Sequence, residues 1–332
     1  MSLVTVTPTS DGAEARPDMT DAALETVAAT AVPVSVGRGG VARGRVRRTA
    51  MLVLAFVLLC GGWEFYKLVG SDDGSRILGA RVLPRADDAS MPHVFDIARR
   101  FARPEQSVPG SRSVARVVLT ACWFTFRLAL AGCVLGAVVG LLLAILMAQF
   151  RIAERGLLPY VVLSQTVPLV ALAPLVVGWG GRLHIGGVAW QPWMSVSVIA
   201  SYLAFFPVAV GALRGLQSPT EASLELMRSY AASWGQTLWR LRLPAAVPYL
   251  VPALRLAGAS SVVGAIVAEI STGTRGGVGR LIIQYAQQAT GDPAKVYTAI
   301  IGAAVLGLVV AGLVSLLDLA LRAHQPRRVA AA

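Results

Sequence analysis

The sequence predicts an all-α integral membrane protein with about six transmembrane helices, and three observations support this prediction. Hydrophobic residues make up 55% of the 332 residues, and charged residues only 14%, whereas roughly a quarter of the residues of a soluble domain are charged. Apolar runs recur along the chain at about the 20-residue length that a helix needs to cross a bilayer. The arginines behind the net charge of +12 lie between these runs, as basic residues do in membrane proteins.

Composition also excludes several classes of function. A nucleic-acid-binding surface would gather the arginines on one folded face with interleaved aromatic residues, and the spacing here does not, so no nucleic-acid partner is expected. The three cysteines and three histidines lack metal-ligand spacing, and neither a phosphate-binding loop nor a nucleophile elbow occurs. We therefore expect no enzyme, no metal site and no bound cofactor.

The expected elements follow in order along the chain. Residues 1–48 lack an apolar period and end in a basic run, which indicates a disordered cytoplasmic tail. Residues 49–116 would hold the first span and an external segment, 117–322 the main transmembrane domain, and 323–332 a second cytoplasmic tail. Pro192 and Pro207 are expected to break the fourth span. The six spans are expected at about 49–69, 117–148, 156–180, 188–213, 246–272 and 296–321.

Basic residues set the expected orientation, because cytoplasmic loops are enriched in Lys and Arg. The arginines before the first span place the amino terminus inside, and six spans return the carboxyl terminus to the same side. The long connection after the fourth span is then cytoplasmic. Residues 70–116 would be external although they carry several arginines, whose charge acidic residues of the segment offset in part.

Two spans carry features that predict how they pack. Gly132, Gly136 and Gly140 lie four residues apart in the second span, which places bare backbone on one helical face and lets a neighbouring helix approach closely. The third span contains several prolines, among them Pro168, next to polar residues. Because proline leaves carbonyl groups unpaired, this helix is expected to lie against protein or a water-filled cavity.

The cytoplasmic stretch from 218 to 244 is predicted to form two short helices with a sharp break. Ser218 and Glu221 have the spacing of a capping box, and Ser233 and Gln236 repeat that spacing fifteen residues later. Bulky apolar residues recur there at helical spacing, namely Leu226, Met227, Tyr230, Trp234, Leu238 and Leu241. The stretch is either an ordinary loop on the membrane surface or a knob that inserts into a groove of a soluble partner.

The run ELMRSYAASWGQTLWRLRLPAAVPYLVPALRLA at 225–257 resembles the signature loop of binding-protein-dependent ABC transporter permeases. That signature reads E-A-A, three residues, G, nine residues, I, one residue, L-P. Glu225 stands at its first position, Ala231 at the glycine, Leu241 at the isoleucine, and Leu243–Pro244 at the end. The resemblance covers about 117–320 and includes QTVPLVALAPLVVGW at 165–179, TFRLALAGCVLGAVVG at 125–140 and VVGAIVAEI at 262–270.

This resemblance implies the type I ABC importer permease fold in the bacterial inner membrane. The implied partners are ABC ATPase subunits, a second permease subunit in a homodimer or a heterodimer, an extracytoplasmic solute-binding protein and membrane lipid. ATP would be used by the ATPase subunit, whose groove would receive the signature loop as a coupling helix. The expected coupling residues are Glu225, Tyr230, Ala231, Ala232, Ser233, Trp234, Leu243 and Pro244.

The translocation path is expected to include Gln165, Thr166 and Pro168, with Glu269 as a further candidate. Glu269 is an acidic residue inside an apolar span, so it either lines the path or a gate, or lies at the outer interface. The implied substrate is a small organic nutrient. The sequence is most similar to permeases for thiamine-related pyrimidines or riboflavin, in a wider subgroup that also takes nitrate, taurine and sulfonates.

Two points remain open on the sequence alone. Ala231 replaces the motif glycine, and alanine enters a left-handed turn less readily than glycine, so either the bend stays right-handed or coupling is altered. The alternative function is an ion-coupled secondary transporter. That class usually shows internal repeats and acidic relays within the membrane, and no repeat is visible here.

Overall fold

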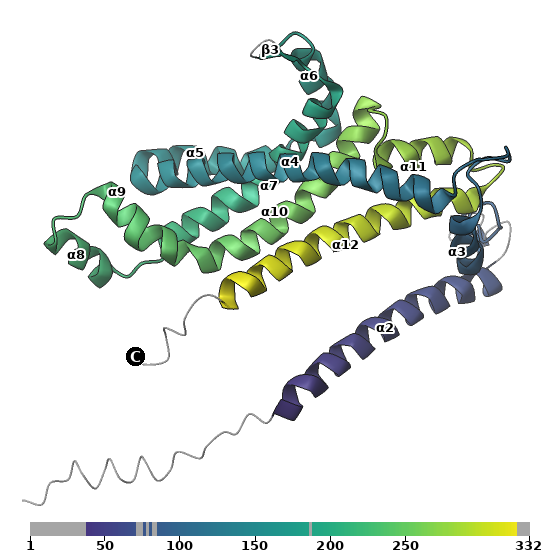
Figure 1. The fold of residues 1–332 in the computed structure, drawn as a ribbon, viewed down its shortest axis with the longest axis horizontal. Coiled ribbons are helices and arrows are strands. Elements are labelled where there is room, and N and C mark those ends of the chain that lie inside the picture. Colours follow the sequence, from purple (N-terminus) through teal and green to yellow (C-terminus); the bar gives the residue numbers. More distant parts are fainter. Residues whose placement is uncertain (1–37, 71–75, 78–79, 82–84, 186–187, 324–332) are drawn as a thin grey trace, which may run out of the picture. The chain divides into compact units, whose positions relative to one another are not determined.

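The chain is helical, as the sequence predicts, in a computed structural model that describes residues 38–70, 76–77, 80–81, 85–185 and 188–323 (Figure 1). It divides into two compact units, 1–62 and 63–332. Two short antiparallel strand pairs occur, β1 (Arg76–Ile77) with β2 (Ala80–Arg81) and β3 (His184–Ile185) with β4 (Val188–Ala189). Of the expected tails at 1–48 and 323–332, residues 1–37 and 324–332 lie outside the described residues. Residues 38–48, predicted to be disordered, are helical, and so is Ala323.

The helices of the described residues are given in chain order. They are α2 (Arg38–Val69), α3 (Val94–Ala102), α4 (Val114–Gln149), α5 (Arg151–Leu163), the 3₁₀ turn η1 (Ser164–Thr166), α6 (Leu169–Gly180), α7 (Pro192–Leu216), α8 (Glu221–Ser229), α9 (Trp234–Thr237), the π-helical turn η2 (Leu238–Arg242), α10 (Leu243–Thr272), α11 (Val278–Gln287) and α12 (Pro293–Ala323).

Four stretches among the described residues are long and apolar enough to cross a membrane. They are Val114–Gln149, Pro192–Leu216, Trp234–Thr272 and Pro293–Leu316. The pair Arg151–Thr166 and Leu169–Gly180 forms a fifth span if its two parts, bent by 103°, are taken together. The first expected span lies in α2, which begins at Arg38 and whose first turns have side chains outside the described set. The predicted count of six is therefore confirmed only in part.

The break in the membrane helices lies in the third predicted span, and the prediction that the fourth span is broken is wrong. Pro192 is the first residue of α7, where a missing N–H costs nothing, and α7 continues through Pro207. In the third span, Val167 precedes Pro168 and is extended, with φ −72° and ψ 126°. Proline disfavours the helical conformation in the residue before it, so the chain turns at this point.

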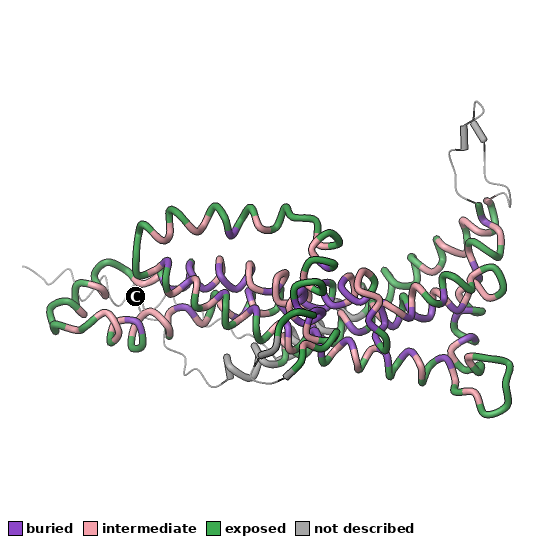
Figure 2. Tube along the Cα trace, turned by 90° about the horizontal axis from the view of Figure 1, so that it is seen from above, coloured by how far each residue is buried: buried purple, intermediate pink, exposed green. Residues whose placement is uncertain are grey.

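The centre of the bundle is the contact of α4 and α10 with α7. A Cβ added at Gly132 would lie 2.5 Å from the Cβ of Ala200, and one at Gly136 would lie 2.7 Å from the Cβ of Ala204. Gly140 faces the next turn of α7 in the same way. Only residues without side chains permit this approach, and the buried positions accordingly run along the middle of the bundle (purple in Figure 2).

Polar side chains join α3 to α12 at the end of the bundle opposite α8 and α9 (Figure 1). Arg100, which is buried, donates from Nε to Asp292 Oδ2 at 2.5 Å and from Nη1 to the carbonyl of Pro104 at 2.9 Å. Lys295, also buried, donates to the carbonyl of Glu105 at 3.1 Å. At least one arginine of the predicted external segment is therefore held by protein groups.

A second polar contact fixes the turn before α3. The Lys67 ammonium donates to the Asp88 carboxylate and, at 2.5 Å, to the carbonyl of Met91. This hydrogen bond and the charge of Lys67 hold the pKa of Asp88 below its ordinary value. Trp63 also donates to the carbonyl of Pro92, at 3.1 Å. The turn is thus tied to the last residues of α2.

Candidate functional site

The first helix of the stretch 218–244, α8, starts two residues later than the sequence predicts. Its N-cap is Thr220, whose hydroxyl accepts from the backbone N–H of Ser223 at 3.4 Å. The predicted cap, Ser218, instead donates to the carbonyl of Gly215 at 2.8 Å. Ser218 closes the last turn of α7, because that helix runs on to Leu216 and leaves carbonyl groups that need donors.

The end of α8 is a Schellman motif with an alanine in the left-handed position. Ala231 has φ +50° and, among the described residues, is the only one other than glycine with positive φ. Its N–H donates to the carbonyl of Arg228 at 2.8 Å, and the N–H of Ala232 donates to that of Met227 at 3.0 Å. These are the two bonds that define the motif. Ala231 therefore adopts the conformation expected of the motif glycine, and the bend does not stay right-handed.

The second helix begins immediately after this bend, and its predicted capping box is confirmed. The backbone N–H of Ser233 donates to Gln236 Oε1 at 2.8 Å, and the N–H of Gln236 donates to Ser233 Oγ at 3.3 Å. The chain then passes through α9 and the π-helical turn η2 into α10. Two helix ends separated by a few residues force the sharp change of direction at 230–233.

Side chains around the bend divide into exposed and anchoring groups. Leu226, Tyr230 and Trp239 are exposed by 56%, 77% and 73%. Trp234 is half-buried against a core cluster that includes Leu238. The expected coupling residues Glu225, Ala231, Ser233 and Pro244 are exposed, and Ala232 and Leu243 are half-buried. The structure thus places six of the eight on α8, the bend and the first residue of α9, while Leu243 and Pro244 lie at the start of α10.

Trp239 is a surface aromatic that the sequence reasoning missed. The apolar period pointed to Leu238 and Leu241, and Leu238 is indeed buried. A large apolar residue on the outward face departs from that period, so a search for core positions passes over it. The sequence did contain one sign of an interface at this position. Trp239 is followed by Arg240, and Trp and Arg are both enriched in protein interfaces.

Three of the four expected path residues lie together at the bend between α5 and α6. Gln165, Thr166 and Pro168 are all exposed there. The hydroxyl of Tyr202 on α7 donates to the carbonyl of Ser164 and fixes the bend to the bundle. Although the sequence predicts that this span lies against protein or a cavity, α5 in this single chain contributes one buried residue, Val161.

Glu269 is separate from these three residues and has no exposed surface. Its carboxyl group lies between α4, α10 and α11, where Oε1 accepts from the hydroxyl of Thr125 at 2.8 Å. Oε2 accepts from the backbone N–H of Gly279, also at 2.8 Å. Among the described residues, no group of three or more His, Cys, Asp or Glu side chains could hold a metal ion.

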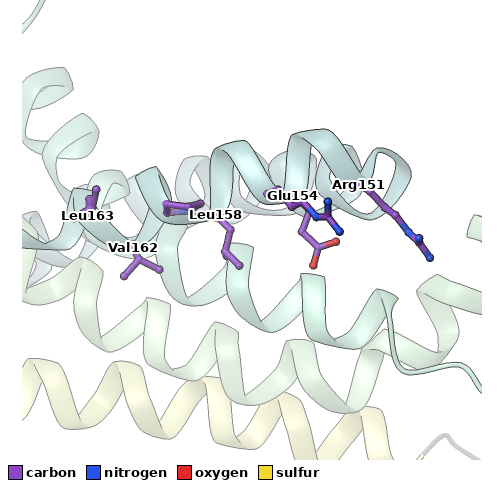
Figure 3. Close-up of a pocket in the computed structure, with 7 residues that line it drawn as sticks. Arg151, Glu154, Leu158, Val162 and Leu163 are labelled. Carbon is purple, nitrogen blue, oxygen red and sulfur yellow. The ribbon is translucent and has the colours of Figure 1, made fainter.

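A groove of about 780 Å³ follows one face of α5 (Figure 3). Charged side chains line its beginning, where Glu154 accepts from Gln217 Nε2 at 2.9 Å, and apolar ones line the rest. Its lining residues are Arg151, Glu154, Arg155, Leu158, Pro159, Val162 and Leu163. The groove thus leads from a polar end toward the α5–α6 bend that carries Gln165 and Thr166.

Comparisons with known proteins identify the family. A family model described as "Binding-protein-dependent transport system inner membrane component" matches residues 136–328, from the middle of α4 to beyond α12. A probable ABC transporter permease protein of Haemophilus influenzae is 37% identical over 46% of this chain and 58% of its own length. The formylaminopyrimidine transport permease protein ThiX of Halalkalibacterium halodurans is 36% identical over 42% and 52%, respectively.

The taurine transport system permease protein TauC of Escherichia coli is 32% identical over 52% of this chain and 56% of its own length. The chain thus spans between half and three fifths of the length of these three relatives. The family match covers more than half of the chain and includes the signature loop and all or part of every membrane-crossing stretch found by length and composition. The chain belongs to the family of binding-protein-dependent transport system inner membrane components and is a multi-pass protein of the bacterial inner membrane.

Proposed function

We propose that this chain is the permease subunit of an ATP-driven ABC importer, forming the path for a small organic nutrient and docking on a separate ATPase subunit through α8 and its bend. The main support for this proposal is the bend at Ala231. It turns the chain sharply between two capped helices and leaves Leu226 and Tyr230 exposed beside it. Aromatic side chains often dominate the energetics of protein interfaces.

Coupling through this element would be mechanical. Two hydrogen bonds of the Schellman motif and the capping box of Ser233 hold the bend in one conformation. Trp234 anchors it to the core cluster that includes Leu213 and Leu216 of α7 and Ala246 of α10. A displacement of α8 by the ATPase would therefore reach α7 and α10, and the spans would switch between two states biased by nucleotide.

The translocation path would require a second copy of the chain. Gln165, Thr166 and Pro168 and most of α5 are exposed in the single chain, and proline-broken backbone in a membrane is tolerated only against protein or water. A homodimer would cover these groups and enclose the path between two copies. An extracytoplasmic binding protein would deliver the substrate.

The names of two relatives, which include formylaminopyrimidine and taurine transport, support a substrate class. We propose a small organic nutrient of this kind, with the binding protein setting selectivity. ATP would be bound and used by the partner subunit, and no cofactor by this chain.

Substitution of Ala232 by Glu tests the docking element. A charged side chain at the half-buried tip should abolish co-purification of an ATPase subunit, identified by mass spectrometry, and substrate-stimulated ATP hydrolysis in liposomes. The spans should still insert, because no membrane-facing residue changes. Ala222→Glu is the matched control, since Ala222 is exposed in the first turn of α8, where an acidic side chain is favourable. Full coupling in Ala232→Glu would refute the assignment of the bend as docking element.

A further inference from the structure

The start of α11 has no capping side chain of its own. The N-cap position is Gly277, and the first helical N–H groups, those of Val278 and Gly279, therefore need acceptors from elsewhere. Val278 donates to Thr125 Oγ1 on α4 at 2.9 Å, and Gly279 donates to Glu269 Oε2 on α10 at 2.8 Å. The hydroxyl of Thr125 in turn donates to Glu269 Oε1 at 2.8 Å.

All the side chains in this arrangement are inaccessible to solvent. Thr125, Glu269 and Val278 each have 0% exposure. A buried carboxyl group is costly unless hydrogen bonds satisfy it, and a helix N-terminus supplies both donors and a favourable dipole. The position of Glu269 inside an apolar span is thus explained by partners within the chain.

Two glycines allow the start of α11 to approach α10 closely. A Cβ at Gly277 would overlap the carboxyl atoms of Glu269, and one at Gly279 would overlap the carbonyl oxygen of Ile266. The backbone of α11 can therefore reach Glu269 only because these two positions lack side chains.

The other end of α11 is also fixed. Tyr285, which is buried, donates its hydroxyl to Glu105 Oε1 at 3.2 Å, and Gln288 Oε1 accepts from Lys295 Nζ at 3.0 Å. Burial and the neighbouring Glu105 raise the pKa of Tyr285, so its hydroxyl remains a donor. Between the two ends, Leu281 packs in a cluster with Val118 of α4 and Ala299 of α12.

We infer that Glu269 and Thr125 form a buried latch that caps α11 and fixes it to α4 and α10, so that Glu269 is a positioning residue. The hydrogen bonds from Glu269 and Thr125 to the α11 backbone hold α11 in place, and the negative charge of Glu269 is not needed for this. This inference does not rest on the transport function proposed above. A carboxyl group that served a path or gate by its charge would need contact with solvent or substrate, and Glu269 has no exposed surface.

Two substitutions of Glu269 should differ in whether they keep the hydrogen bonds to α11. Gln keeps an acceptor for the Gly279 N–H and offers a donor to Thr125 Oγ1, so it preserves the latch without the charge. Leu has a similar size but leaves the Gly279 N–H without an acceptor, which is costly for a buried group. Thr125→Val removes the acceptor of the Val278 N–H in the same way, whereas Thr125→Ser keeps it.

Labelling of a buried thiol measures release of α11 in the purified full-length chain in detergent. The reporter is Leu281→Cys, in a background with Cys60, Cys122 and Cys133 replaced by Ala, and the probe is N-ethylmaleimide. The control reporter is Ala212→Cys on α7, which has 0% exposure. Glu269→Leu and Thr125→Val should raise the labelling rate of the first reporter by about tenfold or more and leave the second unchanged. Glu269→Gln and Thr125→Ser should stay within about twofold of the parent.

Three outcomes would overturn the inference. One is unchanged labelling of Leu281→Cys in both Glu269→Leu and Thr125→Val. The second is an equal rise at both reporters in Thr125→Val, which would indicate general loosening of the fold. The third is labelling in Glu269→Gln as fast as in Glu269→Leu, which would show that the charge of Glu269 is needed to hold α11 in place. If Glu269→Leu does not fold, Thr125→Val carries the test alone.

Discussion

Replacing Ala231 by glycine should stabilise the bend after α8. A left-handed conformation costs a residue with a Cβ roughly 1–2 kcal/mol relative to glycine. Glycine loses part of this advantage, about 0.5–1 kcal/mol, because it has more conformational freedom to lose on folding. The difference leaves a net stabilisation of about 0.5–1 kcal/mol for Ala231→Gly, confined to the α8–α9 bend because Ala231 is exposed and has no core partner.

Hydrogen exchange at the two Schellman amides measures this effect directly. The N–H groups of residues 231 and 232 donate to the carbonyls of Arg228 and Met227, so they exchange only when the bend opens. A gain of about 0.5–1 kcal/mol corresponds to exchange that is about two- to fivefold slower. Mass spectrometry of peptides that cover 226–237 in the detergent-solubilised chain gives the required resolution.

Ala232→Gly is the matched control, because the adjacent Ala232 does not have a positive φ. Glycine brings no relief of strain there and should speed exchange by a similar factor through the entropy of the open state. The two substitutions should therefore change exchange in opposite directions. If Ala231→Gly speeds exchange as Ala232→Gly does, the left-handed bend is not the conformation in the membrane protein, and the strain argument fails.

Two further predictions concern the bundle. Gly136→Ala should lower stability by about 1–3 kcal/mol through overpacking, because the added Cβ would lie 2.7 Å from the Cβ of Ala204. Gly156→Ala, in α5 with nothing within 4 Å, should raise it by up to about 1 kcal/mol; equal thermal shifts for the two would contradict the packing argument. Arg100→Met should lower stability by about 2–3 kcal/mol, because Asp292 loses its partner in a largely buried pair. Arg100→Met combined with Asp292→Asn should recover part of that loss, and no recovery would show that the pair is not the cause.

The sequence predicts the membrane helices well because lipid imposes one requirement on all of them. Each needs a long apolar run with its backbone hydrogen bonds satisfied internally, and α4, α7, α10 and α12 begin and end within a few residues of the expected spans. The location of the break was harder to predict. Pro207 lies inside α7 without ending it, whereas the chain breaks before Pro168, where Val167 is extended. The two prolines look alike in sequence, so the sequence alone did not show which span is broken.

The bend after α8 was predicted from local signals, and its handedness was not. The capping box of Ser233 and Gln236 fixes where α9 starts, and that information lies within a few residues. The sign of φ at Ala231 instead depends on a balance between two hydrogen bonds gained and the strain of a Cβ. A single sequence does not show which contribution is larger, so the structure was needed to decide.

Glu269 shows why an acidic residue within a span cannot be assigned from its own neighbourhood. An ionisable group in an apolar run indicates that something polar lies near it in the fold, but substrate, solvent and backbone N–H groups are all polar. In this chain the polar partner includes Thr125, which is 144 residues away in sequence. The local clue was the pair Gly277 and Gly279, since closely spaced glycines after a buried acid permit the backbone to approach it. The acid and the glycines together indicate a helix start held by a side chain from another helix, whereas the acid alone suggests a path.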